Sequence, residues 1–366
     1  MSTKRVGLIA RCDNGGLGNQ SWEFFNHIGP ERVVIVDLGD SGRGRSNRER
    51  FTTPHQDCSD FDFRVNDGRN LSDENATWLA RECDVVMTFE TSYSQTFWDI
   101  AREHGTKTVL MVHVEQFDRM DTPDEIWVPT PYRTDLLSTK NPYLVPWPVA
   151  TSRMPCRDVR KNASVFAHLR SSSRYDRNGT KIVEAAVKSV KTPCEMVVVG
   201  DGRASGRFAR SRQNRRVETS VLGSHEDYRY VVPCESDVLV LPRRYAGLCM
   251  TVDEAQAKGI PSIMLDVEPY RGVLGVHTVK ASRGVARRMR GGAFHVAQAD
   301  GRHLADVMDR LMSDGELVEK LSQDALRRAD MLSWDLWAER YDALLRHDVP
   351  YAKVVDKNSL LKRKVL

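Results

Sequence analysis

The stretch LPRRYAGLCMTVDEAQAKGIPSIMLD, residues 241–266, runs from the end of one apolar strand through a glycine-containing loop and a short helix into a second apolar strand. Small residues stand in the loop, and two neighbouring carboxylates, Asp253 and Glu254, follow one helical turn later. In open α/β sheets, ligands bind at the carboxyl ends of parallel strands. This stretch therefore predicts a parallel α/β sheet with a ligand site at the loop.

Short apolar strands alternate with amphipathic helices along most of the chain. We expect strands at residues 5–11, 32–38, 84–90, 106–114, 125–130, 163–169, 195–202, 237–242 and 261–266, and a helical tail over 302–346. The alternation predicts an α/β fold with parallel sheets and helices on both of their faces. The polar stretch over residues 39–70 has no periodicity, and we expect no regular structure there.

A proline-rich segment, residues 141–150, separates two such sets of strands. We therefore expect two Rossmann-like domains with parallel sheets facing across a cleft, one over residues 1–150 and one over residues 151–331. Residues 332–366 supply a last helix and a basic tail. A ligand would lie in the cleft, at the carboxyl ends of both sheets.

The composition is typical of a soluble globular protein, with 40% hydrophobic and 28% charged residues among 366. No apolar run approaches the ~18 residues of a membrane helix, and the first residues enter a strand directly, which argues against a signal peptide. None of the seven cysteines belongs to a Cys-x-x-Cys pair, which argues against a zinc site and a disulfide framework. We therefore expect a cytoplasmic protein.

Arginines are clustered although the net charge is only +4. The clusters lie at residues 43–50, 203–216 and 283–290. One interpretation is a GC-rich genome, which favours arginine codons. The other is a phosphate-rich partner, because guanidinium groups match the geometry of phosphate oxygens.

The first predicted strand is followed by a glycine-rich loop, Asn14 to Asn19, that opens a helix. Gly16 and Gly18 are candidate binding residues, because glycines let a backbone approach a ligand closely and helix N-termini attract anions. The spacing is not Gly-x-Gly-x-x-Gly, and only Asp37 is available for a ribose, which disfavours a nicotinamide dinucleotide. The loop either closes over a phosphate or sugar or is a tight strand–helix turn.

The second half of the chain contains a similar turn with Arg170 and Arg177 just before a helix. Guanidinium groups beside free backbone N–H groups suit a diphosphate, and the alternative is a solvated basic loop. Gly202 belongs to a tight turn after the next strand and either contacts a base or reverses the chain.

Three titratable residues end strands of the first half. His113 follows a very apolar strand and either hydrogen-bonds a sugar or is a satisfied core residue. Glu90 and Glu115 are the best-placed acidic groups on that side, and each is alternatively a surface ion-pair partner. These three are the candidate catalytic residues.

Residues 237–266 resemble the donor-site signature of family 4-type glycosyltransferases of the GT-B fold. Residues 254–261, EAQAKGIP, match its Glu-Ala-x-Ala-x-Gly-x-Pro helix. Other segments resemble the family in the same order: DNGGLGNQ its acceptor-domain glycine loop, VFAHLR…RNGTKIVEA its diphosphate segment, VVVGDG the next strand, VPWPVA the linker, and LSWDLWAERYDALL the closing helix that crosses back to the first domain.

By this resemblance, Glu254 binds the nucleotide ribose. The backbone N–H groups that meet the diphosphate and sugar are those of Gly247, Leu248, Cys249 and Met250. The family's first glutamate is replaced here by Ala246, which leaves the donor sugar open, and its diphosphate lysine is replaced by Arg177.

The resemblance implies a transferase that moves a hexosyl or pentosyl group from a nucleotide-diphospho-sugar to an acceptor hydroxyl, with retention. It implies no metal and no other cofactor, since Arg170, Arg177 and helix dipoles neutralise the diphosphate. The chain also resembles phage and actinobacterial glycosyltransferases, some of which modify hydroxymethylated pyrimidines of phage DNA in the host cytoplasm. The arginine clusters fit that acceptor, and an anionic lipid, a teichoic-type polymer or a protein fits the same charge. The alternatives are a nucleotide-sugar 2-epimerase of the same fold and a degenerate, non-catalytic module that binds sugars or nucleic acid.

Overall fold

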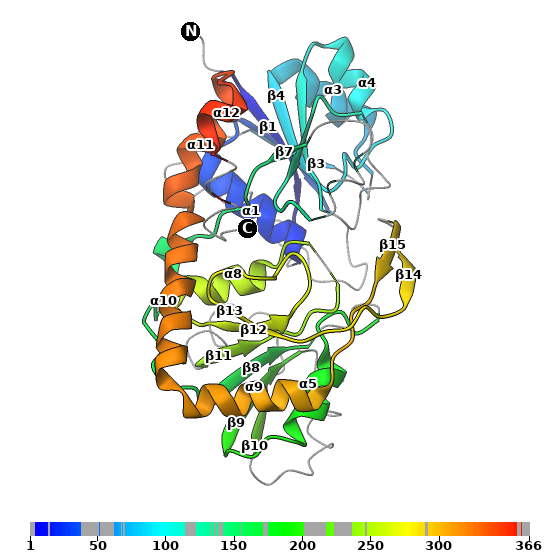
Figure 1. Ribbon diagram of the computed structural model, residues 1–366. Coiled ribbons are helices and arrows are strands. Elements are labelled where there is room, and N and C mark those ends of the chain that lie inside the picture. Colours follow the sequence, from blue (N-terminus) through cyan, green and yellow to red (C-terminus); the bar gives the residue numbers. More distant parts are fainter. Residues whose placement is uncertain are drawn as a thin grey trace. The chain divides into compact units, whose positions relative to one another are not determined.

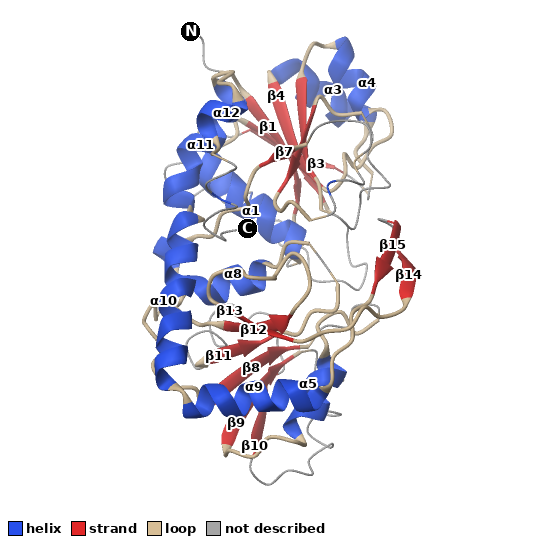
Figure 2. Ribbon diagram, viewed as in Figure 1, coloured by secondary structure: helices blue, strands red, loops and turns tan. Residues whose placement is uncertain are grey.

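The computed structural model describes residues 4–13, 15–37, 51, 62–66, 68, 70–113, 122–132, 134, 137, 142–154, 156–170, 175–200, 217–222, 236–245, 247–289, 292–356 and 360. The chain forms two compact units. The N-terminal unit comprises Met1–Trp147, Arg290–Gly292 and Leu336–Asn358, and the C-terminal unit comprises Pro148–Met289, Ala293–Asp335 and Ser359–Leu366. Each unit contains one parallel sheet with helices packed against it (Figures 1 and 2).

The N-terminal unit has a seven-stranded sheet in the order β3-β2-β1-β4-β5-β6-β7. Its strands are β1 (Val6–Arg11), β2 (Arg32–Val36), β3 (Asp62–Asn66), β4 (Val85–Phe89), β5 (Lys107–Met111), β6 (Glu125–Val128) and β7 (Tyr143–Leu144). Its helices are α1 (Gly16–Ile28), α3 (Asp73–Glu82), α4 (Phe97–Glu103), most of α11 (Trp334–Arg346) and α12 (Tyr351–Val354). Continuous apolar runs such as that of β4, all buried, are typical of strands covered on both faces.

The C-terminal unit has a six-stranded sheet in the order β10-β9-β8-β11-β12-β13. Its strands are β8 (Val165–Leu169), β9 (Cys194–Val199), β10 (Val217–Leu222), β11 (Val238–Val240), β12 (Ser262–Leu265) and β13 (Val276–Val279). The helices are α5 (Thr180–Val187), α8 (Met250–Ala257), α9 (Gly301–Ser313) and α10 (Gly315–Met331), and β14 (Ala286–Met289) pairs with β15 (Gly292–His295).

Both sheets have the strand order 3-2-1-4-5-6 of a Rossmann fold, with an additional edge strand in the N-terminal unit. The strand order reverses direction between β1 and β4 in one sheet and between β8 and β11 in the other. The predicted class, α/β with two parallel Rossmann-like sheets, is confirmed. The boundaries at residues 150 and 331 stay predictions.

The expectation of no regular structure over residues 39–70 is wrong for β3. This strand lies at the edge of its sheet, and only its last residue, Asn66, is buried. A half-exposed edge strand needs no apolar run, so its sequence carries no hydrophobic signal. In the described part of the chain, every helix is too short or too polar to span a bilayer.

Helix α11 packs into the N-terminal unit through aromatic side chains. Trp337 and Tyr341 are fully buried. The Tyr341 ring lies edge-on to Trp127 at a centroid distance of 5.4 Å, and its hydroxyl donates to the carbonyl of Pro146 at 2.9 Å. Helix α11 is therefore part of the core of the N-terminal unit.

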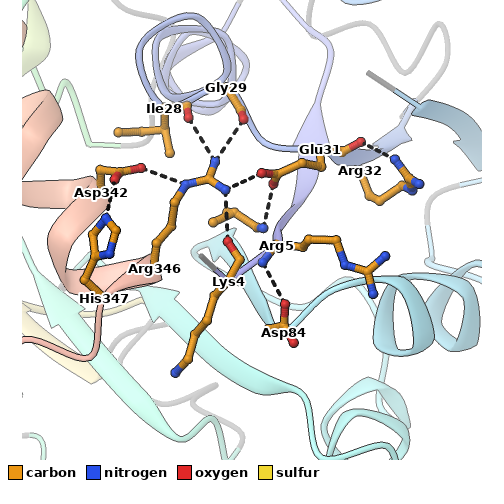
Figure 3. Close-up of polar contacts among 11 residues, drawn as sticks. Lys4, Arg5, Ile28, Gly29, Glu31, Arg32, Asp84, Asp342, Arg346 and His347 are labelled. Carbon is orange, nitrogen blue, oxygen red and sulfur yellow. Dashed lines mark hydrogen bonds and ion pairs between the residues drawn. The ribbon is translucent and has the colours of Figure 1, made fainter. Parts of the chain in front are cut away.

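The end of α11 holds the end of α1 through Arg346 (Figure 3). Its guanidinium donates to the carbonyls of Ile28 and Gly29, at 3.3 and 3.0 Å, where α1 ends. It also pairs with Glu31 and with Asp342, the latter at 2.7 Å. Cations stabilise the negative end of a helix dipole, so Arg346 fixes α1 beside its sheet.

Candidate functional site

The carboxyl ends of β8 and β11, the two strands flanking the reversal in strand order, form the candidate donor site. The loop after β8 leads to α5, and the loop after β11 leads to α8. Gly179 caps α5 with φ 73°, and a Cβ there would lie 2.3 Å from the carbonyl oxygen of Pro242. The two loops are thus in direct backbone contact, and this contact requires glycine.

Arg244 ties the same two loops together. Its N–H donates to the carbonyl of Arg177 at 2.9 Å, and its Nη1 donates to the carbonyl of Tyr175 at 2.8 Å. Its Nε donates to the carbonyl of Ala297, also at 2.8 Å. Sequence analysis did not single out Arg244, because its neighbour Arg243 offers the same chemistry and only the fold distinguishes them.

The predicted diphosphate residues Arg170 and Arg177 both lie at this end of the sheet. The N–H of Arg170 donates to the carbonyl of Val199 at 2.8 Å, which places Arg170 between the ends of β8 and β9. Its Nη1 is buried and has no hydrogen-bond partner among the described residues. The Arg177 guanidinium lies 5.7 Å from the ring centroid of Tyr245, in the β11 loop.

Asp176 occupies the N-terminus of α5. Its carboxylate accepts the N–H groups of Thr180 at 2.8 Å and of Lys181 at 3.1 Å. Tyr175 and Asp176 both adopt left-handed backbone conformations, with φ of 60° and 54°, that bring this carboxylate back onto the helix. The expectation of free N–H groups at this helix start is therefore wrong for these two groups, which already have an anionic partner.

The N-terminus of α8 is arranged differently. Its N-cap residue, Cys249, makes no side-chain cap hydrogen bond. The carbonyl of Gly247 accepts the Tyr270 hydroxyl at 2.9 Å, and the carbonyl of Leu248 accepts Nη1 of Arg243 at 3.2 Å. These bonds fix the loop that leads into Met250, and α8 keeps an uncapped positive end suited to an anion.

The neighbouring carboxylates of α8 have separate environments. Asp253 is buried and pairs with Nη1 of Arg328 at 2.6 Å, and the same nitrogen donates to Oε1 of Gln256 at 2.6 Å. Burial raises the pKa of Asp253, while the Arg328 pair acts in the opposite direction. Glu254 is only half-buried, on another side of the helix. Asp253 is therefore structural, and the predicted role of Glu254 in ribose binding stays a prediction.

His168 lies beneath this site and was not among the predicted residues. It is fully buried in β8, with Nδ1 2.8 Å from the carbonyl of Val240 and Nε2 3.0 Å from Oγ1 of Thr180. Because a carbonyl only accepts, Nδ1 carries the proton and Nε2 accepts from the Thr180 hydroxyl. Desolvation lowers the pKa of His168 to about 4, so the ring is neutral at pH 7.

In the N-terminal unit, His113 and Glu90 follow β5 and β4, at the carboxyl end of that sheet. His113 is buried, and its Nε2 lies 3.2 Å from Oε1 of Gln20 in α1. Glu90 is half-buried with φ 62°, and its N–H donates to the carbonyl of Met111 at 2.8 Å. Left-handed conformations of residues other than glycine cluster at functional sites.

The two candidate glycines of the first loop differ in environment. Gly16 is exposed, and a Cβ there would meet nothing within 4 Å. Gly18 is buried, and a Cβ there would lie 1.7 Å from the carbonyl oxygen of Asp13. Gly18 is therefore needed for close packing between the loop and α1, whereas Gly16 faces outward from the helix start.

Several predicted residues lie outside the described residues: Glu115, Gly202, Ala246 and the arginine clusters at 43–50 and 203–216. In the third cluster, Arg283 and Arg287 are described and exposed. The Arg287 guanidinium lies 5.7 Å from the ring centroid of Tyr175, in the loop after β8. Arg287, in β14, thus lies next to the loop after β8.

Residues 168–314 match the family model described as "Glycosyl transferases group 1". The matched segment runs from β8 through α9 and contains the loops, the arginines and the helix α8 described above. A sequence comparison with curated proteins finds no match. The C-terminal unit therefore contains a segment similar to group 1 glycosyltransferases, and the resemblance seen in the sequence is confirmed.

Solved structures share the fold over nearly the whole chain. Sucrose-phosphate synthase from Thermosynechococcus elongatus matches with a TM-score of 0.66 at 14% identity, covering 93% of this chain and 98% of that one. The lipopolysaccharide outer core galactosyltransferase WaaB matches with a TM-score of 0.62 at 13% identity and the same coverage. Anabaena HepE, solved in complex with UDP-glucose, matches with a TM-score of 0.61 at 11% identity, again covering 93% and 98%. The likeness shows the GT-B fold.

Proposed function

We propose that the protein transfers a sugar from a nucleotide-diphospho-sugar to an acceptor hydroxyl, with retention at the anomeric carbon. The observation that carries this proposal is the pair of hydrogen-bonded loops after β8 and β11, which brings Arg177 beside Tyr245, in the loop that leads to α8, within the family segment. HepE was solved with UDP-glucose, so UDP-sugars are the first donors to test.

The leaving diphosphate needs fixed positive groups, because its charge grows as the bond to the sugar breaks. Arg170, Arg177 and the uncapped N-terminus of α8 supply such groups without a metal ion. Glu254 would accept the ribose hydroxyls. In the N-terminal unit, His113 is hydrogen-bonded to Gln20, and Glu90 lies at the neighbouring strand end. We propose that His113 would contact a sugar.

Acceptor-dependent release of UDP tests the reaction itself. We expect the protein, given UDP-glucose or UDP-galactose and an acceptor, to release UDP and to form an α-glycoside detectable by NMR. Formation of an epimerised sugar nucleotide without transfer would identify the 2-epimerase instead. Binding of the nucleotide with neither reaction, across a panel of donors, would identify a non-catalytic module.

Nucleotide affinity tests the role of Glu254 separately from turnover. We expect Glu254→Gln to weaken UDP binding, measured by calorimetry, by at least about tenfold, because hydrogen bonds to a charged group are worth roughly 1.5–3 kcal/mol. Glu319→Gln, in α10, removes the same charge elsewhere in this unit and should bind UDP normally. Unchanged affinity in Glu254→Gln would remove this residue from the site.

We further propose duplex DNA with hydroxymethylated pyrimidines as the acceptor. The exposed Arg287 beside the loop after β8, and the exposed Arg283 of the same cluster, support this choice, because arginines bind phosphates and position a protein on DNA. Affinity should fall with salt with a log–log slope near −4 to −5 if about 4–6 phosphates are contacted. Arg283→Ala with Arg287→Ala should flatten the slope and leave donor hydrolysis intact.

Sugar transfer to hydroxymethylated DNA, compared with unmodified DNA of the same sequence, decides this acceptor. Labelling of the modified DNA alone is the expected result. Absence of labelling together with no DNA binding at low salt would assign the arginines to genome composition and the acceptor to another class of hydroxyl compound.

A further inference from the structure

A cavity of about 190 Å³ lies in the N-terminal unit, at the amino ends of strands of its sheet. Lys107, Glu125 and Tyr143 line it, and each is the first residue of its strand, in β5, β6 and β7. Asp348 and Tyr351, after α11, close the other side. Because the strands are parallel, their amino ends lie a full strand length from the carboxyl ends that carry His113 and Glu90.

One wall of this cavity is aromatic. The rings of Tyr143 and Tyr351 pack at a centroid distance of 4.9 Å, tilted by 38°. The Tyr351 hydroxyl donates to the carbonyl of Leu144, the neighbour of Tyr143. Both side chains are half-exposed, so the pair is fixed in position and keeps ring surface accessible.

The other wall is charged and electrically balanced. Nζ of Lys107 lies 2.7 Å from Oε1 of Glu125, and Nε1 of Trp127 donates to Oε2 of the same carboxylate at 3.0 Å. Asp348, at the rim, pairs with Lys4. Each carboxylate of the lining therefore has its own ammonium partner, and the charges of Lys107, Glu125, Asp348 and Lys4, the last of which lies outside the lining, sum to zero.

We propose that this cavity binds one neutral sugar ring. A free ion gains little from a lining whose charges cancel, and an apolar ligand would strip water from four charged groups without replacing their hydrogen bonds. A polyhydroxy ring donates hydroxyls to Glu125 and Asp348, accepts from Lys107, and covers a tyrosine face with its C–H groups. The volume, below the ~300 Å³ lower end for drug-sized ligands, suits a single ring.

This site is separate from the proposed catalytic function. A sugar bound at the amino ends of the strands is remote from His113 and Glu90, which lie at the carboxyl ends of the same sheet. It would therefore be a non-reacting unit of a glycan. Such a site would hold a carbohydrate chain on the protein and raise the local concentration of its other units.

Saturation-transfer NMR with methyl α-D-glucopyranoside, methyl α-D-galactopyranoside and methyl α-D-mannopyranoside, with UDP present at saturation, tests the site. We expect at least one of these glycosides to bind with a dissociation constant on the order of 1 mM. The matched charged probes, methyl glucuronoside and glucosamine, should bind more weakly. Binding of none of the neutral glycosides, or tighter binding of a charged probe, overturns the proposal.

Variants locate the binding. Tyr143→Ala should weaken binding by about tenfold, as expected for loss of one aromatic contact, whereas Tyr143→Phe keeps the ring and should retain it. Tyr132→Ala, in the same unit but outside the cavity, should bind like the original protein.

Asp348→Asn is a second variant in case Tyr143→Ala does not fold. The Asp348 side chain is 63% exposed, so its substitution should not disturb folding. Sugar binding by this variant should weaken by about twofold to tenfold, the range for one hydrogen bond. Unchanged binding in a folded Tyr143→Ala and in Asp348→Asn overturns the assignment. Because Tyr143 and Asp348 line this cavity and are not among the residues proposed for transfer, the effects of these variants are independent of whether the protein is a transferase.

Discussion

Helices α5 and α8 start beside the same reversal in strand order, yet their N-termini are used differently. The first-turn N–H groups of Thr180 and Lys181 in α5 already bind the Asp176 carboxylate. In α8 the N-cap residue, Cys249, offers no side-chain acceptor. The carboxylate in the first turn of α8, Asp253, pairs with Arg328, whereas Asp176 binds the N–H groups of α5 directly.

The two helices are also anchored differently. The start of α5 rests on backbone contact, with Gly179 against Pro242. In α8 the anchor is a buried ion pair, Asp253 with Arg328 from α10. Helix α8 is therefore held by a buried ion pair, and the start of α5 is held by close backbone packing. Four experiments test the difference between the two helix starts.

The largest effect is expected from Arg328→Met. It leaves the Asp253 carboxylate buried without the guanidinium that pairs with it, which costs roughly 3–5 kcal/mol of stability. The urea concentration at the midpoint of unfolding should therefore fall. The double variant Arg328→Met with Asp253→Leu removes both charges and should recover most of the loss. An unfolding midpoint unchanged in Arg328→Met would mean that the pair does not anchor α8.

The next effect concerns Gly179→Ala, which combines a left-handed backbone with a Cβ 2.3 Å from the carbonyl oxygen of Pro242. We expect a loss of about 3 kcal/mol, at the upper end for overpacking. Gly105→Ala is the control, because Gly105 has φ 71° but nothing within 4 Å of its Cβ position. It should lose only about 1–2 kcal/mol, the cost of the left-handed conformation. Equal losses would show that the loop contact is unimportant.

His168 lies in β8 and hydrogen-bonds both Val240 of β11 and Thr180 at the start of α5. Its titration makes the free energy of unfolding depend on pH. Its pKa is about 4 in the folded protein, against 6.5 for the ordinary group. The unfolded chain therefore binds a proton first as the pH falls, and the contribution of His168 to stability is complete above pH 6.5 and declines between pH 6.5 and 4. The loss reaches about 3 kcal/mol at the acid end.

Urea unfolding measured at intervals over this pH range, for the original protein and for His168→Gln, checks the titration. The difference in unfolding free energy between the two proteins should narrow as the pH falls, because the variant lacks the ionisable ring. Parallel curves would assign the acid sensitivity to other groups.

The smallest effect is expected from Asp176→Asn. It weakens the bonds to the α5 N–H groups at a cost of about 1 kcal/mol and removes a negative charge beside the proposed diphosphate residues. UDP should bind about twofold to fivefold more tightly, in keeping with a partly solvated charge. Asp300→Asn, which alters the cap of α9, should show a similar loss of stability and no change in affinity. Weaker UDP binding in Asp176→Asn would make Asp176 part of the site.

Much of the fold was predictable because parallel strands covered on both faces need continuous apolar runs. The runs at 84–90 and 261–266 correspond to β4 and β12 in the structure. Edge strand β3 and the β14–β15 pair lack such runs and were missed. The signature over 237–266 located the loop and helix of the candidate site, since its small residues and helix start reflect local backbone geometry.

The partners of individual side chains were not predictable. Asp253 and Glu254 look equivalent in the sequence, and the difference arises from Arg328, 75 residues later. The role of Asp176 depends on two left-handed residues in succession, Tyr175 and Asp176, which no pattern indicates. Such distinctions depend on tertiary contacts, and periodicity carries no information about them.

The place of α11 has a consequence for protein synthesis. The N-terminal unit is built from two main pieces of chain, and Leu336–Asn358 returns to it after Pro148–Met289 and Ala293–Asp335 of the C-terminal unit. During translation, Trp127 and the end of α1 must therefore wait for Tyr341 and Arg346, which follow Trp147 by 194 and 199 residues. At about 5–20 residues per second this delay is roughly 10–40 s. The first half of the chain thus leaves the ribosome with an unfinished core.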